Sequence, residues 1–378
     1  MSRTRRFPAP ISSPPSLSAG FDIRFMREAL ALAEKGRGWV APNPLVGCVI
    51  VKDDRIIGRG YHRRYGACHA EVAALTEAGE RARGATMYVT LQPCNHFGKT
   101  PPCTEAVIRA GIRRLVIAAR DPNLKTKCED GRQKLVTAGI EIATGIGETE
   151  ALKQNEVYVH NLRHRRPFVV LKLAATLDAK IADFAGRSRW ITSEASLDYV
   201  HRLRGEYAAI LVGAGTVRKD NPSLTCRAPG MRNPLRVVLD PRLTVPASSR
   251  VFMPPGAVLL FHGSQAPPKS RRQFRSQDIS IREIGLDRDG LLAWPEILDR
   301  LFQTGIASVL IEGGAKVAAS ALSAGIVNKL YLFLAPRILG QGISFSNELG
   351  PRPLSKAIAM KDWRSLPVGN DLLIEGYF

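Results

Sequence analysis

Three potential zinc ligands and one acid constrain the chain more than any other feature. His69 is followed two residues later by Glu71, and eight residues separate Cys94 from Cys103. One imidazole and two thiolates can hold Zn²⁺ and leave the fourth tetrahedral position to water. Zinc lowers the pKa of that water to about 7, and a nearby carboxylate can move its protons. We therefore predict that His69, Cys94 and Cys103 bind zinc and that Glu71 shuttles protons in a hydrolytic deaminase.

A closed structural zinc site is the main alternative for these residues. Such a site needs a fourth ligand, and Cys68 is the nearest candidate. Adjacent residues such as Cys68 and His69 rarely point at the same metal, and a structural site does not require an acid two positions after the histidine. We therefore expect an open, catalytic site.

The loop between the two cysteines bears on the substrate. It is stiffened by glycine and proline and carries an amide, an imidazole, an ammonium and a hydroxyl, a set suited to an anionic small molecule. Nucleic-acid editing deaminases instead place their cysteines in a Pro-Cys-x-x-Cys pair. The net charge of +20 still leaves a nucleic-acid base deaminase, acting on tRNA or single-stranded DNA, as the alternative. Its basic residues are spread along the chain, with a local cluster at 160–166.

The alternation of apolar segments predicts two α/β domains in the 378 residues. We expect a zinc deaminase domain at 21–160, a polar linker at 161–167 and a second domain at 168–378. Residues 1–20 hold four prolines and no acid, so we expect them to form a disordered tail. An organelle transit peptide is less favoured, because so many prolines make a poor amphipathic helix. No apolar run predicts a membrane span, and six scattered cysteines fit the cytoplasm.

Both halves place polar residues where strands and helices meet. A strand at 85–91 runs into Pro93-Cys94, and a helix follows Glu71. In the second half, a strand at 308–311 leads into Glu312-Gly313-Gly314 and then a helix, which is a phosphate-binding geometry. Ser188, Arg204 and Arg227 are further residues suited to a phosphate, and Lys172 lies on the first strand of this half. The alternative for the two arginines is that they are solvated surface charges.

These residues belong to a series of ordered motifs that covers 21–378. The motifs are PNPLVG (42–47), HAE (69–71), PCNHFGKTPPC (93–103), LKLAATLD (171–178), SRWIT (188–192), HRLR (201–204), GTVRKDNPSLT (215–225) and IEGG (311–314). They resemble the bifunctional riboflavin-biosynthesis deaminase/reductase family of bacteria. The resemblance implies a cytidine-deaminase-like three-layer α/β/α domain followed by a dihydrofolate-reductase-like α/β domain. It also implies zinc-dependent deamination of 2,5-diamino-6-(5-phosphoribosylamino)pyrimidin-4-one, then NADPH-dependent reduction to 5-amino-6-(5-phosphoribitylamino)uracil.

The resemblance further implies roles for individual residues. NADPH would contact Ala174, Trp190, Thr216, Asp220, Gly314, Ala315 and Lys316. The reductase substrate would contact Ser188, Arg204, Leu224, Arg227 and Glu312, while Lys172 polarises the ribosyl carbonyl. Substrate-facing positions of the deaminase would be Asn43, His62, His96, Lys99 and Asp121. The expected partner is this small phosphoribosyl-pyrimidine, with no nucleic acid and no membrane, and the expected assembly is a homo-oligomer.

The chain departs from the family pattern at several positions. Gln92 replaces a usual Glu, Asn95 a usual Ser, Ala179 a usual Gly and Asn221 a usual Asp. The segment 124–131 replaces a usual Pro and glycine turn. A binding protein with decayed sites is the non-enzymatic alternative, and the intact zinc residues with Glu71 argue against it.

Overall fold

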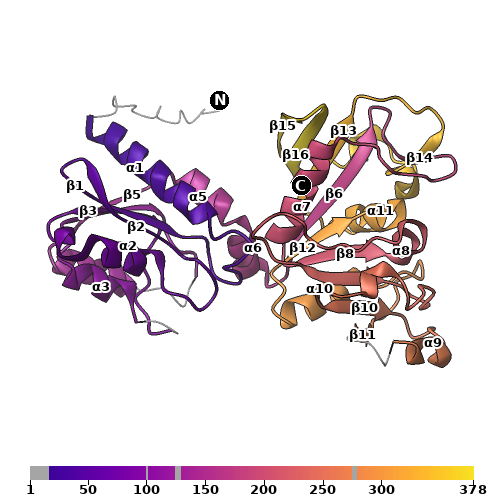
Figure 1. The fold of residues 1–378 in the computed structure, drawn as a ribbon, viewed down its shortest axis with the longest axis horizontal. Helices are drawn as coiled ribbons and strands as arrows, with labels where there is room; N and C mark the ends of the chain where they lie inside the picture. The colour runs from indigo at the N-terminus through magenta and orange to yellow at the C-terminus, as the bar shows by residue number, and fades with distance from the viewer. Residues whose placement is uncertain (1–16, 99–100, 124–128, 275–278) are drawn as a thin grey trace, which may run out of the picture. The chain divides into compact units, whose positions relative to one another are not determined.

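The computed structural model describes residues 17–98, 101–123, 129–274 and 279–378. Contacts divide the chain into two compact units (Figure 1). Unit 1 comprises Met1–Val40 and Pro44–Asn155, and unit 2 comprises Ala41–Asn43 and Glu156–Phe378. The division thus falls at Asn155–Glu156 rather than in the expected linker at 161–167.

Unit 1 is built on a five-stranded sheet of order β2-β1-β3-β4-β5. Its strands are β1 (Gly47–Lys52), β2 (Arg55–Tyr61), β3 (Thr86–Leu91), β4 (Arg114–Ala119) and β5 (Glu141–Thr144). β1 pairs antiparallel with β2 and β3, whereas β3, β4 and β5 run parallel. The carboxyl ends of β3 and β4 therefore meet at one edge of the sheet, which is where α/β folds place their ligands.

Helices cover both faces of this sheet. One face carries α1 (Leu17–Glu34) and α5 (Glu148–Gln154), and the other carries α2 (Ala70–Ala78), α3 (Cys103–Arg109) and α4 (Glu129–Thr137), with a 3₁₀ turn at Gly79–Ala82. This arrangement confirms the predicted three layers. The expected tail at 1–20 is wrong for its last four residues, since α1 begins at Leu17, just after the final proline of the segment. Residues 1–16 lie outside the described part of the chain.

The position of α2 depends on a glycine in β2. A Cβ atom added to Gly60 would lie 2.1 Å from the carbonyl oxygen of Ala70, the first residue of α2. The missing side chain lets the helix lie directly on the strand. Because His69 and Glu71 flank Ala70, this close approach sets the height of both site residues above the sheet.

Unit 2 contains a nine-stranded sheet of order β11-β10-β9-β8-β12-β6-β13-β16-β15. Its strands are β6 (Phe168–Thr176), β8 (Ala209–Gly213), β9 (Leu235–Leu239), β10 (Val258–His262), β11 (Ile279–Glu283), β12 (Ser308–Glu312), β13 (Lys329–Ala335), β15 (Asp362–Val368) and β16 (Asp371–Tyr377). The strands from β11 to β13 are parallel, and β16 and β15 are antiparallel. β7 (Lys180–Asp183) and β14 (Gly342–Ser344) form a separate two-stranded arm.

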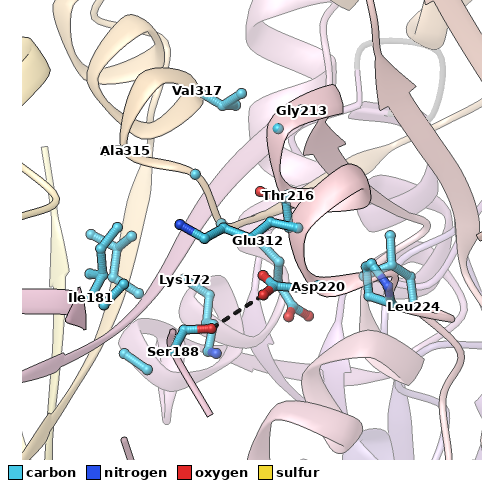
Figure 2. A pocket seen from close by; sticks show the side chains of 18 of the residues that line it. Lys172, Ile181, Ser188, Gly213, Thr216, Asp220, Leu224, Glu312, Ala315 and Val317 are labelled. Atoms are coloured by element: carbon cyan, nitrogen blue, oxygen red, sulfur yellow. Dashed lines mark hydrogen bonds between the residues drawn. The ribbon is translucent and has the colours of Figure 1, made fainter. Parts of the chain in front are cut away.

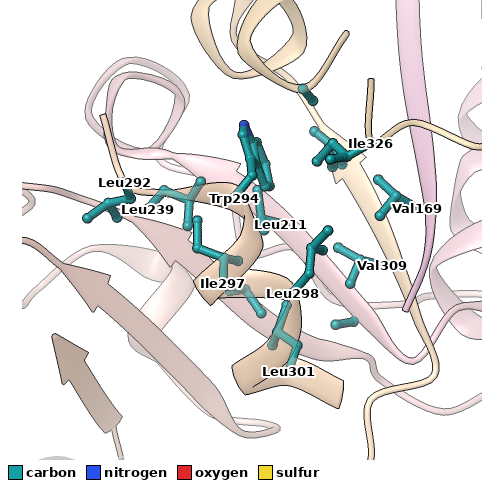
Figure 3. Packing of buried hydrophobic residues seen from close by; sticks show 14 of the residues in the cluster. Val169, Leu211, Leu239, Leu292, Trp294, Ile297, Leu298, Leu301, Val309 and Ile326 are labelled. Atoms are coloured by element: carbon teal, nitrogen blue, oxygen red, sulfur yellow. The ribbon is translucent and has the colours of Figure 1, made fainter. Parts of the chain in front are cut away.

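The core of unit 2 lies on both faces of this sheet. α10 (Trp294–Gln303) packs Trp294, Ile297 and Leu301 against strand residues such as Leu211 and Val309 (Figure 3). α11 (Ala315–Ser323) covers the same face, while α7 (Glu194–Glu206) and α8 (Ala214–Asp220) cover the opposite one. The remaining helical segments are α6 (Glu156–His164), α9 (Pro268–Arg272) and the 3₁₀ turns Arg250–Phe252, Asn347–Leu349 and Leu354–Lys356. Buried apolar side chains on both faces are what a parallel sheet requires.

Two consecutive residues at the division are anchored in different units. The Asn155 side chain accepts a hydrogen bond from the Leu45 N–H at 2.7 Å and donates one to the Leu45 carbonyl at 2.9 Å, inside unit 1. The Glu156 carboxylate accepts from the Lys329 ammonium at 2.8 Å and from the Tyr377 hydroxyl, inside unit 2. Among the described helices, none is both long enough and apolar enough to cross a membrane.

Candidate active sites

The three predicted zinc ligands converge in unit 1. Their ligand atoms all lie within 4.8 Å of one another. His69 Nδ1 is 3.2 Å from Cys103 Sγ and 3.5 Å from Cys94 Sγ. His69 precedes α2, Cys103 begins α3, and Cys94 follows the end of β3. The fold thus brings two helix starts and one strand end to a single point.

The donor set fits zinc. Nitrogen and sulfur ligands at roughly 2.1 and 2.3 Å from a tetrahedral Zn²⁺ stand about 3.6 Å apart, which is close to the separations observed. The Cys103 backbone N–H also donates to Cys94 Sγ at 3.5 Å, an interaction that stabilises a thiolate. Cys68 is exposed and is not part of the cluster, which argues against a fourth protein ligand.

Two ionisable side chains lie against the zinc ligands. Glu71 is buried in the first turn of α2, and burial raises the pKa of its carboxyl to about 6. His62 is also buried, and its ring meets that of His69 edge to face at 5.5 Å. Its Nδ1 lies 3.1 Å from the Cys68 carbonyl, and burial lowers the pKa of His62. The site therefore pairs a buried carboxyl whose pKa is raised with a buried imidazole whose pKa is lowered.

The other predicted deaminase residues differ in how close the structure places them to the zinc ligands. Asp121 follows β4, next to the strand that leads to Cys94, and its Oδ1 accepts from the Asn123 N–H at 2.9 Å. His96 is exposed, and no described contact joins it to the zinc ligands. Asn43 belongs to unit 2 by its contacts. Lys99 and residues 124–128 lie outside the described residues, so the predictions made there have no structural counterpart.

Asn95 is a residue whose structural role the sequence did not reveal. The Thr104 hydroxyl donates to Asn95 Oδ1 at 2.7 Å, and the Thr104 N–H donates to the Cys94 carbonyl at 3.2 Å. These bonds fasten the start of the inter-cysteine loop to α3. The longer amide in place of the usual Ser therefore supports the loop beside the metal.

In unit 2, all the predicted reductase residues line one cavity of about 890 Å³ (Figure 2). They come from β6, β12, both ends of the short helix α8, the start of α11, the C-terminal half of α7, and the loops at 188–190 and 221–227. The cavity lies at the carboxyl ends of the parallel strands, which is the usual ligand position in such sheets. Its volume lies in the upper part of the usual range for small-molecule and cofactor sites.

The glycine turn after β12 fits the phosphates of NADPH. Gly313 and Gly314 have φ angles of 92° and 77°, values that side chains rarely adopt. A Cβ on Gly314 would lie 3.1 Å from Thr216 Oγ1, so a larger residue would crowd the cavity wall. The turn leads directly into α11, whose first backbone N–H groups favour an anion.

Charged groups gather on the neighbouring strands β6 and β12. Lys172 is paired in register with Glu312, and burial lowers the pKa of the Lys172 ammonium. Burial raises the pKa of Glu312, but the Arg204 guanidinium outweighs this effect and leaves it below the usual value. The Ser188 hydroxyl donates to Asp220 at 3.4 Å. Leu224, which is buried, has a φ of 55°, a strained conformation of the kind that clusters at ligand sites.

His201 also lines this cavity and was missed as a site residue. It lies three residues before Arg204 on α7, so the helical period places both on one face. That spacing within the HRLR motif was the signal available in the sequence.

Two family models match the chain. The cytidine and deoxycytidylate deaminase zinc-binding region matches residues 20–119, and the RibD C-terminal domain matches residues 167–374. The riboflavin biosynthesis protein RibD of Aquifex aeolicus is 41% identical over 356 residues, which cover 93% of this chain and 97% of that protein. The chain belongs to the RibD family. RibD of Bacillus amyloliquefaciens is 44% identical over 84% of this chain and 85% of its own length.

Solved structures of the RibD family share the fold. The diaminohydroxyphosphoribosylaminopyrimidine deaminase/5-amino-6-(5-phosphoribosylamino)uracil reductase of Thermotoga maritima has a TM-score of 0.84 and 38% identity, covering 95% of this chain and 99% of that one. RibD of Acinetobacter baumannii gives a TM-score of 0.83 at 33% identity with the same coverage. The chain is therefore a bifunctional enzyme of riboflavin biosynthesis with a deaminase and a reductase domain, and its sites fit Zn²⁺ and NADPH.

Proposed function

We propose that unit 1 hydrolyses the ring amine of 2,5-diamino-6-(5-phosphoribosylamino)pyrimidin-4-one and that unit 2 then reduces the ribosyl group to give 5-amino-6-(5-phosphoribitylamino)uracil. The observation that carries this proposal is the presence, in one chain, of an open His-Cys-Cys cluster with a buried carboxyl and of a cavity suited to NADPH. The Thermotoga maritima protein with the same two-part fold bears both activities in its description.

In the deaminase, His69, Cys94 and Cys103 would hold Zn²⁺, which supplies acidified water when bound. Glu71 takes a proton from the attacking water and returns it to the leaving amine, a role that suits a buried carboxyl with a pKa near 6. His62, whose pKa burial lowers, would offer a hydrogen bond to the pyrimidine. We propose Asn43, His96, Lys99 and Asp121 as further substrate contacts on the family pattern alone.

In the reductase, bound NADPH would supply the hydride that reduces the opened ribosyl carbonyl. We propose that Lys172 donates a hydrogen bond to the carbonyl oxygen, because burial makes its ammonium a more acidic donor. Ser188, Arg204, Leu224, Arg227 and Glu312 would hold the substrate. Ala174, Trp190, Thr216, Asp220, Gly314, Ala315 and Lys316 would hold the cofactor, and all of them line the same cavity.

We propose a small molecule, rather than a nucleic acid, as the partner of the deaminase. The long inter-cysteine loop, with its amide, imidazole, ammonium and hydroxyl groups, supports this choice. We also propose a cytoplasmic enzyme, supported by the free state of the five cysteines that the structure describes. A homo-oligomer is proposed because Phe184 and Ile338, on segments that flank the β7–β14 arm, are 80% and 78% exposed. Light scattering on the purified protein would show a monomer if this assembly is wrong.

A coupled assay tests the proposed reactions. The protein is given the diamino-pyrimidine phosphate, and ammonia release and NADPH oxidation are followed separately, with and without a zinc chelator. We expect the chelator to stop both signals, and the deaminated substrate to restore NADPH oxidation. Ammonia release from tRNA or single-stranded DNA, but not from the pyrimidine phosphate, would overturn the proposal.

A further inference from the structure

The C-terminal half of α7 contacts the three-residue segment Thr225–Arg227. Arg204 Nη1 donates to the Thr225 carbonyl at 3.3 Å, and the Cys226 thiol donates to the His201 carbonyl at 3.1 Å. The Arg227 backbone N–H lies 3.2 Å from His201 Nδ1. Thr225 and Cys226 are thus tied to the helix by hydrogen bonds, and the Arg227 backbone lies beside the His201 ring.

The His201 ring also contacts the Arg227 side chain. Its Nε2 lies 3.0 Å from Arg227 Nε and 2.7 Å from Arg227 Nη2. A guanidinium can only donate, so His201 must present a lone pair, and only a neutral imidazole has one. Burial and the neighbouring cations Arg204 and Arg227 lower the pKa of His201 to about 4, which keeps the ring neutral.

The two arginines of this site are held by different kinds of partner. Arg204 is matched by the Glu312 carboxylate, so its charge is largely cancelled. Arg227 is held by an uncharged ring, so it keeps its full positive charge while losing side-chain freedom. No described contact uses its Nη1 atom, and Arg227 lines the cavity. This combination suits an arginine that receives a phosphate dianion.

We propose that His201 is a positioning residue that orients the Arg227 guanidinium toward the phosphate group of the reductase substrate. The proposal rests on the proposed function in one respect, the assignment of Arg227 to the substrate. It adds that an acceptor without charge is required at position 201, since a carboxylate there would compete with the phosphate for Arg227.

The test compares kinetic constants of the reductase in four variants of the full-length chain. His201→Phe removes the ring nitrogens, including the acceptor Nε2, His201→Asn keeps an uncharged acceptor, and Arg227→Gln removes the cation. The fourth variant combines His201→Phe with Arg227→Gln. KM for the deaminated phosphoribosyl substrate, KM for NADPH and kcat are measured, and ammonia release reports that unit 1 is intact. A substrate analogue without the phosphate serves as the matched ligand control.

We expect His201→Phe to raise KM for the phosphorylated substrate about tenfold, as the loss of a hydrogen bond to a charged group would. KM for NADPH, kcat and KM for the unphosphorylated analogue should stay within about twofold, and His201→Asn should recover part of the loss. The double variant should match Arg227→Gln alone, because His201 acts through Arg227.

Two failures are distinguishable. If Arg227→Gln leaves KM for the phosphorylated substrate unchanged, the proposed role of Arg227 is wrong. If Arg227→Gln raises that KM but His201→Phe does not, or if the two effects multiply in the double variant, the role of His201 is overturned. Should His201→Phe fail to fold, His201→Asn decides the question. A moderate rise confined to KM for the phosphorylated substrate would support the role of His201, whereas unchanged constants or a loss confined to kcat would contradict it.

Discussion

The Arg204 guanidinium forms a bidentate salt bridge with the Glu312 carboxylate, with N–O distances of 2.7 and 2.8 Å. Both side chains are largely buried in the wall of the reductase cavity. The pair joins α7 to β12, and Lys172 lies beside Glu312 on the next strand. Breaking it would leave two buried cations without their shared anion.

We therefore expect Glu312→Gln to destabilise unit 2 by roughly 3 kcal/mol, the usual effect of removing one partner of a buried ion pair. NADPH oxidation should fall at least about tenfold, since Arg204 and Lys172 lose their fixed orientation. Thermal unfolding and both activities would be measured. Unchanged unfolding together with full NADPH oxidation would contradict the prediction, and Glu348→Gln, an acid of the same cavity lining with no described ion pair, provides the control.

Glu71→Gln should abolish ammonia release while zinc stays bound, because Glu71 is no part of the ligand cluster. The amide keeps the size of the side chain but cannot take up a proton. NADPH oxidation on supplied deaminated substrate should be unchanged. Metal analysis and the two assays check this, and the loss of zinc from the variant would assign Glu71 a ligand role instead.

Gly60→Ala should weaken zinc binding without touching a ligand. The added methyl group would lie 2.1 Å from the Ala70 carbonyl, so α2 must move away from β2 and take His69 with it. A misplacement of this size lowers activity about a hundredfold in comparable sites. Gly20→Ala is the matched control, since no atom lies within 4 Å of its added Cβ. Equal zinc content and ammonia release in both variants would show that the close approach is dispensable.

Ala179→Gly should stabilise unit 2 by about 0.5–1 kcal/mol. Ala179 has a φ of 61°, which is unfavourable for a residue with a Cβ, and glycine relieves that strain despite its greater freedom in the unfolded chain. Ala357→Gly is the control, because Ala357 has a φ of −59° and should gain nothing. Denaturant unfolding compares the two, and a stabilisation of equal size in both would remove the strain explanation.

His201 should make unit 2 less stable in acid. Its pKa is lowered by burial and by Arg204 and Arg227 to about 4, whereas Glu312 and Asp198 act in the opposite direction. The pKa of this side chain in the unfolded chain is near 6.5, so between pH 6.5 and pH 4 the unfolded chain binds more protons than the folded one. The contribution of His201 to the free energy of unfolding is therefore complete above pH 6.5 and is lost as the pH falls toward 4. We expect a loss of about 1 kcal/mol from pH 7 to pH 5 that His201→Asn removes, measured by unfolding at both pH values.

The sequence was sufficient to predict a site where its functional residues stand at the ends of helices and strands that local patterns also predict. His69 and Cys103 stand at helix starts and Cys94 just after a strand, so the pattern that predicted the elements also predicted their meeting point. In the second half, a glycine pair between a strand and a helix identified the turn at Gly313 in the same way. Both predictions rest on short-range rules that tertiary contacts do not alter.

The sequence was insufficient where the role of a residue depends on a partner that is distant in the sequence. Residues 161–167 look like a linker because their exposed face is polar, yet 161–164 end α6 and the Asn161 side chain donates to the Arg166 and Ala307 carbonyls. Asn221 has an explanation of the same kind: it caps α8 with a φ of 42° and accepts from the Arg250 N–H at 2.8 Å. The role of His201 likewise depends on Arg227, a partner 26 residues away.

The opposite anchors of Asn155 and Glu156 bear on how two enzymes came to share one polypeptide. Each neighbour is committed to its own unit, Asn155 to Leu45 and Glu156 to Lys329. At this point the chain passes from one unit to the other across a single peptide bond, with no spacer between the two anchors. Gene fusion or fission at this point would leave the anchors of Asn155 and Glu156 in place, so the two activities could be joined or separated here, with Ala41–Asn43 as the one segment that such a cut would divide from unit 2.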